Sequence, residues 1–190
     1  MSVFFFSLSV SAYAAQEPTV VVAAAPSAST AAAAPDTTKK PYTVWRVYSG
    51  NILRLAEDEK VVLLGVDVPS SEINRKIYNE ARRTGLKMED LRAAGRQAMK
   101  YMRTLAQGKR VWVEFDKEQR DSYKRLLGYV YLDDGTFLNA ELIKAGYARA
   151  VSMQPNEKYK DLFAKLEDEA KQNKKGLWGL GYFQRMENPR

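Results

Sequence analysis

The sequence of 190 residues contains neither cysteine nor histidine. Without cysteine the chain can form no disulfide, no thiolate zinc site and no thiol nucleophile. The absence of histidine excludes Ser–His–Asp triads, histidine general bases and histidine metal ligands. Any hydrolytic chemistry would therefore depend on carboxylates, a hard metal ion and arginine.

Acidic residues are too few to balance the basic ones. The chain has 30 lysines and arginines against 23 aspartates and glutamates, so its formal net charge is +7. Residues 1–42 contain two residues of each sign, and the whole excess therefore lies in residues 43–190. A basic domain favours polyanionic partners such as nucleic acid, anionic lipid or acidic polysaccharide. The alternative is that the charge only keeps the protein soluble.

The sequence also lacks a hydrophobic run long enough for a transmembrane helix, which needs about 20 apolar residues. The apolar residues 1–15 end in the small-residue pattern Ala12-Tyr13-Ala14 and are followed by Gln16-Glu17-Pro18. This arrangement is typical of an export signal, so we expect a periplasmic or secreted protein. Residues 16–42 are rich in Ala, Pro, Ser, Thr and Val, and this composition predicts a disordered linker.

The sequence from residue 43 predicts a strand-rich domain with helices packed on it. β-Branched and aromatic runs predict strands at 44–47, 52–55, 61–66, 111–115 and 127–132. Helical spacing of apolar residues predicts helices at 71–84, 89–106, 139–145 and from 159 to about 175, with Asn139 as the cap of the third. This order suits an α+β, mainly β, Greek-key barrel of the oligonucleotide/oligosaccharide-binding (OB) type over 43–180. Residues 181–190 are expected to form a tail.

Five segments, in order, resemble the landmarks of the staphylococcal nuclease (thermonuclease) family. Three are Val-Val-Leu-Leu-Gly-Val-Asp-Val-Pro at 61–69, Tyr-Lys-Arg-Leu-Leu-Gly-Tyr-Val-Tyr at 123–131 and Gly-Leu-Trp at 176–178. The others are the strand at 113–120 and Asn-Ala-Glu-Leu-Ile-Lys-Ala-Gly-Tyr-Ala at 139–148. The resemblance covers about residues 44–178. It implies a five-stranded barrel with about three helices and calcium-dependent phosphodiester hydrolysis.

The resemblance also implies which residues would do this chemistry. Asp67 matches a metal-binding aspartate, Arg125 a phosphate-binding arginine, and Tyr123 a platform for the nucleotide base. Hard cations need oxygen ligands, and arginines hold the phosphate and stabilise its developing charge. The stretch 73–87 is longer than the family usually has there and is a candidate cover for the cleft.

Three further family positions hold residues that cannot perform their original role. Asn51 replaces the other metal aspartate and retains only an amide oxygen, Val62 replaces a phosphate-binding arginine, and Ser70 replaces the glutamate that acts on the attacking water. Glu72, two residues beyond Ser70, is a candidate substitute base. The alternative is a solvated acid in the first turn of a helix, where the helix dipole favours it.

Other charged and aromatic residues leave two interpretations open. On the helix at 89–106 a basic stripe could track phosphates or could be an ordinary solvated face; it consists of Arg92, Arg96, Lys100 and Arg103. Asp67 and Arg125 could form a buried ion pair that remains from an ancestral site. Trp45, Trp112 and Trp178 are expected in the core rather than as ligand platforms.

Three functional hypotheses follow from these patterns. The first is a thermonuclease-like domain that no longer cleaves and binds nucleic acid, another polyanion or a protein, with no cofactor required. The alternative is a divergent phosphodiesterase that hydrolyses DNA or RNA with Ca²⁺ and uses Asp67, Arg125, Asn51 and Glu72. The third is an interaction domain for a protein of the cell envelope, unrelated to nucleic acid.

Overall fold

A computed structural model describes residues 40–188 of the chain. The predicted export signal at 1–15 and residues 16–39 of the predicted linker lie outside this range. No helix among the described residues is both long enough and apolar enough to cross a membrane.

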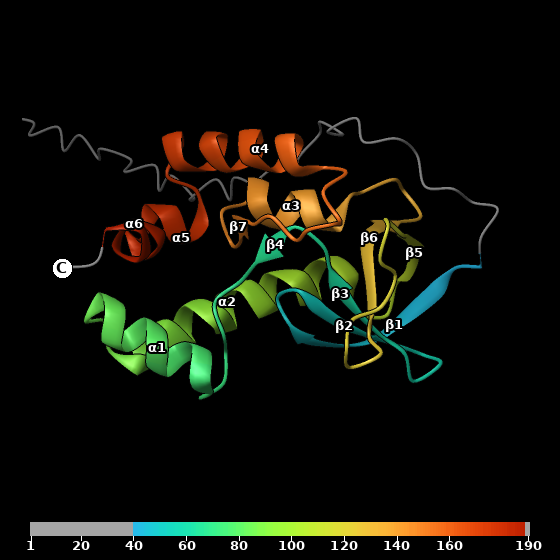
Figure 1. Cartoon of the computed structure of the whole chain (residues 1–190), viewed down its shortest axis with the longest axis horizontal. Coiled ribbons are helices and arrows are strands. Elements are labelled where there is room, and N and C mark those ends of the chain that lie inside the picture. Colours follow the sequence, from blue (N-terminus) through green and yellow to red (C-terminus); the bar gives the residue numbers. More distant parts are fainter. Residues whose placement is uncertain (1–39, 189–190) are drawn as a thin grey trace, which may run out of the picture.

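Five strands close into a barrel in the order β1-β2-β3-β6-β5 (Figure 1). Strand β3 pairs with β6 in parallel, and the other neighbours in the barrel pair antiparallel. The structure confirms the predicted α+β fold with a five-stranded barrel. The barrel strands are β1 (Tyr42–Ser49), β2 (Ile52–Leu55), β3 (Lys60–Leu63), β5 (Arg110–Glu114) and β6 (Leu126–Leu132).

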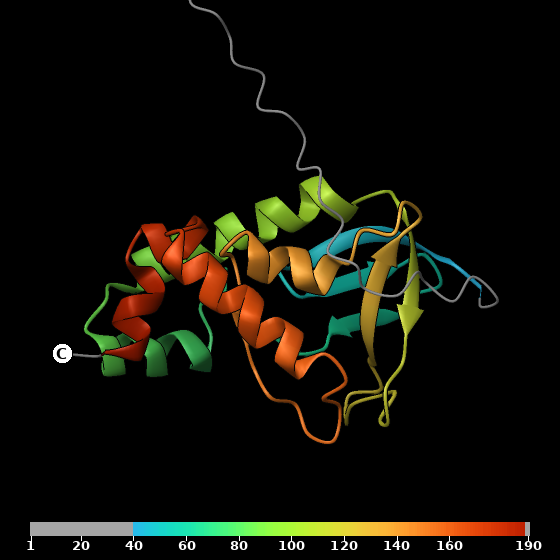
Figure 2. The ribbon, with the colours of Figure 1, turned by 90° about the horizontal axis from the view of Figure 1, so that it is seen from above.

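The helices form two groups (Figures 1 and 2). Residues of α2 (Met88–Ala106), α3 (Leu138–Lys144) and α4 (Lys160–Gln172) join the main core inside and beside the barrel. A second apolar cluster unites α1, α5 and α6 with parts of α2 and α4, away from the barrel. Its helices are α1 (Arg75–Thr84), α5 (Gly176–Gly179) and α6 (Tyr182–Glu187).

A two-stranded sheet lies between the barrel and the second cluster (Figure 1). Strand β4 (Val66–Asp67) follows β3 after a tight turn, and β7 (Arg149–Ala150) follows α3. The two strands pair antiparallel, with Asp67 directly opposite Arg149. This pairing fixes the surroundings of the retained family aspartate.

The sequence prediction of a tail after residue 180 needs correction. Residues 182–187 form α6, and Tyr182, Phe183 and Met186 are buried in the second cluster. The ring of Phe183 packs 4.9 Å from that of Trp178, which is buried as predicted. The packed domain therefore continues to the end of α6, because these apolar side chains complete that cluster.

Asn139 does not cap its helix as the sequence predicts. Helix α3 begins at Leu138, and the Asn139 side chain is completely buried. Its amide accepts a hydrogen bond from the Val130 N–H at 2.9 Å and donates to the Leu64 carbonyl at 2.8 Å. Asn139 therefore ties α3 to strand β6 and to the turn that leads into β4.

Candidate functional site

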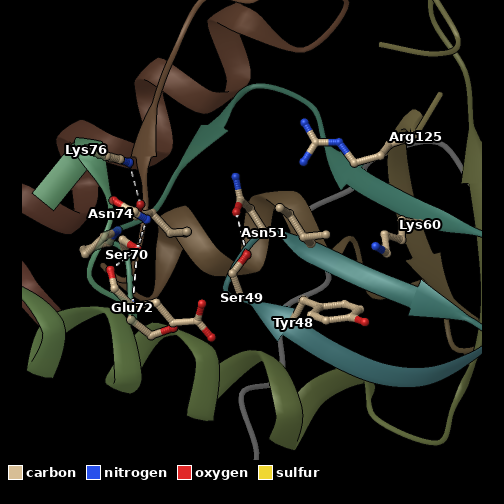
Figure 3. Close-up of a pocket in the computed structure, with 13 residues that line it drawn as sticks. Tyr48, Ser49, Asn51, Lys60, Ser70, Glu72, Asn74, Lys76 and Arg125 are labelled. Carbon is tan, nitrogen blue, oxygen red and sulfur yellow. Dashed lines mark hydrogen bonds between the residues drawn. The ribbon is translucent and has the colours of Figure 1, made fainter. Parts of the chain in front are cut away.

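A pocket of about 440 Å³ lies where the turn between β1 and β2 meets the segment between β4 and α1 (Figure 3). Three cations line it, Lys60, Lys76 and Arg125, together with a single carboxylate, Glu72. The ring of Tyr48 forms part of the wall. Lys76 and Arg125 also pair with carboxylates outside the lining, whereas Lys60 forms no ion pair among residues 40–188. The pocket therefore suits an anion better than a metal ion.

Asn51 stands at the turn between β1 and β2 and lines this pocket. Its side-chain oxygen accepts a hydrogen bond from the Ser49 hydroxyl at 3.0 Å, and its amide nitrogen donates to the Val66 carbonyl at 3.3 Å. Both ends of the side chain are thus engaged in holding the turn against β4. This arrangement gives Asn51 a structural role at the position to which the resemblance assigns a metal-binding aspartate.

Ser70 belongs to a hydrogen-bonded turn that leads into α1. Its hydroxyl accepts from the Asn74 amide at 2.7 Å and donates to the Glu72 carbonyl at 3.0 Å. Asn74 in turn caps α1 by accepting from the Ile77 N–H at 3.1 Å. The turn rests directly on Gly95 of α2, where a side chain would overlap the Ser70 carbonyl. Ser70 therefore shapes the pocket wall, and a hydroxyl of ordinary acidity offers no general base.

The retained aspartate, Asp67, is neutralised by two cations. The Lys76 ammonium donates to one carboxylate oxygen of Asp67 and also to the Val68 carbonyl at 2.8 Å. On the other oxygen, the Arg149 guanidinium donates at 3.3 Å. Lys76 comes from α1, within the stretch that is longer than the resemblance leads one to expect. Helix α1 therefore places a positive charge on the carboxylate to which the resemblance assigns a metal.

The oxygen atoms of Asp67 and Asn51 do not fit a calcium site. Ca²⁺ takes six to eight oxygen ligands and is usually held by several carboxylates. Here both Asp67 oxygens contact cations, and the Asn51 oxygen already accepts a hydrogen bond. Within residues 40–188, no three acidic side chains gather as a metal-binding group. Glu72 faces the pocket, whereas Asp67 is not among the pocket's lining residues.

Arg125 is held at the opposite wall by Asp121, not by Asp67 as an ancestral ion pair would require. Its Nε and Nη2 both lie 2.6 Å from one Asp121 oxygen. Burial tends to raise the pKa of Asp121, but the hydrogen bonds from Arg125 and from backbone N–H groups lower it below its usual value. The guanidinium remains about a third exposed and lines the pocket. Arg125 is therefore oriented by its partner and keeps donors for a phosphate.

The other predicted binding residues lie outside this pocket. Tyr123 is 79% exposed, and its ring centre lies 5.2 Å from the Arg125 guanidinium. On α2, Arg92 and Arg96 both pair with Glu89, at 3.2 and 2.6 Å, as expected for a solvated helix face. Lys100 and Arg103 are exposed, and Arg103 lines a separate shallow cavity beside Trp45. Val62 is buried in the barrel core, where an arginine would not fit without a partner.

A buried carboxylate, Glu80, lies behind the pocket on α1. Burial raises its pKa, while the nearby charge of Lys76, whose ammonium is 3.9 Å away, lowers it. One of its oxygens is buried without a hydrogen-bond partner in the described structure, as is the nearby Tyr182 hydroxyl. Lys76 thus lies between two carboxylates, since it is hydrogen-bonded to Asp67 and lies 3.9 Å from Glu80.

The pocket residues that the sequence did not point to include Tyr48, Lys60 and Lys76. Lys60 begins β3, and Tyr48 nearly ends β1, so both positions depend on the register of the barrel. Lys76 precedes Glu80 by four residues, a spacing that signals a helical ion pair. The contact of Lys76 with Asp67 depends on tertiary packing, so no local sequence pattern predicts it.

Comparisons with known proteins agree with this fold. The family model described as "Staphylococcal nuclease homologue" matches residues 60–179. A thermonuclease of Staphylococcus intermedius is 32% identical over 146 residues, which cover 75% of this chain and 79% of that protein. An uncharacterized endonuclease of Escherichia coli is 30% identical over 138 residues, covering 71% and 74%. Endonuclease YncB of Bacillus subtilis is 43% identical over 86 residues, covering 44% of this chain and 40% of that protein. The chain belongs to the staphylococcal nuclease family.

Proposed function

We propose that this protein binds nucleic acid through its phosphates and no longer cleaves it. The observation that carries the proposal is the Lys76 ammonium on Asp67, where the family's chemistry requires a metal ion. A lysine in that place supplies a fixed positive charge without a metal. The pocket then offers an anion three cationic side chains from three different elements, Lys60, Lys76 and Arg125.

The loss of cleavage follows from the demands of phosphodiester hydrolysis. The reaction needs a metal to polarise the phosphate, a positioned base for water and cations for the developing charge. Here the positions of one metal ligand, the base and one arginine hold Asn51, Ser70 and Val62. Loss of one such group typically lowers the rate by about 10²–10³. The losses of groups that act together are not additive, but we expect the protein to be close to inactive.

A second function, a divergent calcium-dependent phosphodiesterase, is favoured by one observation. Relatives at 30–32% identity carry the names thermonuclease and endonuclease. In this chain Glu72 faces the pocket and could act as a base, and Asp67 would have to release Lys76 to bind Ca²⁺. The two functions therefore differ in whether Lys76 stays on Asp67 when calcium is present.

We also propose that the protein is exported, on the pattern of residues 1–15. In a periplasmic or secreted setting, its nucleic-acid ligand would be extracellular. A protein partner in the cell envelope is the competing choice. Binding that does not respond to salt would favour that choice, because contacts to phosphates weaken steeply with salt.

The proposal is tested by oligonucleotide binding to the full chain in EDTA. Fluorescence anisotropy with a labelled single strand of about 12 nucleotides compares the wild type with Arg125→Ala and with Lys165→Ala. Lys165→Ala removes one positive charge, as Arg125→Ala does. Lys165 is exposed on α4 and does not line the pocket, so this variant controls for the change in net charge. We expect Arg125→Ala to weaken binding about tenfold or more, and Lys165→Ala to have little effect. Equal affinities for the two variants would contradict the proposal.

A further inference from the structure

Four cations lie side by side on the outer surface of the barrel. Strand pairing places Arg46 opposite Arg54, and Arg54 opposite Lys60. Lys60 precedes Val61, and Arg125 precedes Leu126, the parallel partner of Val61. We call Arg46, Arg54, Lys60 and Arg125 the cation row. It crosses β1, β2, β3 and the start of β6, a width of about 14 Å at the usual strand spacing.

Nothing in the described structure fully neutralises the cation row. Arg54 pairs with the highly exposed Asp58, and Arg125 pairs with Asp121. Among residues 40–188, no ion pair involves Arg46 or Lys60. Like charges directly opposite each other on neighbouring strands destabilise a sheet. Such a row is therefore a cost to folding unless an anion lies across it.

Two aromatic side chains stand between these cations. Irregularities in the register of β1 fall at Trp45 and at Tyr48, and both rings point outward, 59% and 39% exposed. The sequence prediction that Trp45 belongs to the core is therefore wrong. The Arg54 guanidinium lies 4.7 Å from the Trp45 ring centre, and the Lys60 ammonium lies 5.1 Å from that of Tyr48. We call Trp45 and Tyr48 the aromatic pair.

The cation row and the aromatic pair connect two hollows of the surface. Tyr48, Lys60 and Arg125 belong to the pocket described above. Trp45 and Arg46 line the shallow cavity that Arg103 and Gln107 of α2 complete. The surface is thus continuous from the pocket, over β2, to the basic end of α2.

We propose that this face binds a single-stranded nucleic acid, with phosphates along the cation row and bases stacked on Trp45 and Tyr48. Cationic grooves with interspersed aromatic rings bind single strands, because every unpaired base offers a flat face for stacking. A duplex hides those faces, and anionic lipids and polysaccharides have no aromatic rings to stack. Barrels of this architecture commonly bind oligonucleotides on the face of their second and third strands. The inference rests on the proposed function and names its ligand and path.

The test measures how affinity depends on strand length in the full chain. Anisotropy in EDTA compares single strands of about 3 and about 12 nucleotides in the wild type and in Trp45→Ala. Tyr78→Ala is the matched control, because Tyr78 is 53% exposed but lies on α1. We expect the longer strand to bind more tightly. Trp45→Ala should weaken binding of the longer strand about 5- to 150-fold, whereas Tyr78→Ala should leave this binding unchanged.

Charge is tested separately with Arg46→Ala against Lys165→Ala. Losing one phosphate contact should reduce the slope of log affinity against log salt by about 0.7 in Arg46→Ala only. If both Trp45→Ala and Arg46→Ala bind like the wild type while Arg125→Ala is weak, this inference falls and the pocket proposal stands. Equal binding of a duplex of the same sequence would also overturn it. If neither the wild type nor any variant binds oligonucleotides, both the proposed function and this inference are wrong.

Discussion

On the proposed function, substitution of Lys76 by alanine should raise the affinity of Asp67 for calcium. In the structure the Lys76 ammonium donates to Asp67 and to the Val68 carbonyl. A divalent cation cannot share that carboxylate oxygen with an ammonium, because the two positive charges repel at such short range. Calcium must therefore displace Lys76 before it can bind Asp67, and Lys76→Ala removes this step.

The size of the effect follows from the contacts that calcium would have to break. The side chains of Lys76 and Asp67 are 37% and 29% exposed, so their ion pair is partly screened and contributes about 1 kcal/mol at most. The hydrogen bond from the Lys76 ammonium to the Val68 carbonyl adds about 1–2 kcal/mol when it is reduced for the same solvent screening. Together these amount to about 1–3 kcal/mol, so Lys76→Ala should bind calcium about 10- to 100-fold more tightly than the wild type.

Isothermal titration calorimetry of the full chain with calcium chloride measures this change. Lys165→Ala is the control for the loss of one positive charge far from the site, and thermal unfolding checks that Lys76→Ala remains folded. Adding Asp67→Asn to Lys76→Ala should abolish the gain. If Lys76→Ala binds calcium no better than Lys165→Ala, the ammonium is not what keeps the metal away, and the reasoning is wrong.

Three further predictions concern the framework of the site. Gly95→Ala places a methyl group against the Ser70 carbonyl. We expect the free energy of unfolding, measured by urea denaturation, to fall by about 1–3 kcal/mol, and oligonucleotide binding to weaken. Unchanged binding would contradict the role of this contact in shaping the pocket. Burial raises the pKa of Glu80, so the contribution of Glu80 to the free energy of unfolding should fall as pH rises from about 4.3 through the raised pKa of the folded state. Glu80→Gln should flatten this fall in melting temperature, and parallel profiles would refute it. Asn139→Ala removes the acceptor of the buried Val130 N–H and should lower the free energy of unfolding by about 2–4 kcal/mol; a loss well below that range would show that the bond is dispensable.

The barrel could be predicted from the sequence because its signals are local. β-Branched runs such as Val111–Val113 and helical apolar spacing such as that in residues 89–106 reflect burial of one face of each element. Helix α6 was missed because six residues are too short to show a helical period. Its apolar side chains are explained only by the second cluster that they complete.

The site was less predictable, because its key contacts join distant elements. The substitutions at Asn51 and Ser70 could be noticed from the family pattern, but their hydrogen-bonded roles could not. The sequence predicts Trp45 in the core because an apolar residue in a strand usually packs inward, and only the irregular register of β1 turns it outward. The contact between Lys76 and Asp67 joins α1 to β4, and α1 is itself positioned by packing against α2.

The central claim is that the nuclease fold remains while the metal-dependent chemistry is gone. The most direct measurement is cleavage of a fluorescent single-stranded DNA by the full wild-type chain in calcium and in EDTA, beside Arg125→Ala. We predict no calcium-dependent cleavage above the level of the variant, although the wild type still binds the strand. Cleavage that requires calcium and disappears in Arg125→Ala would contradict the account and show that the site hydrolyses phosphodiesters with its altered residues.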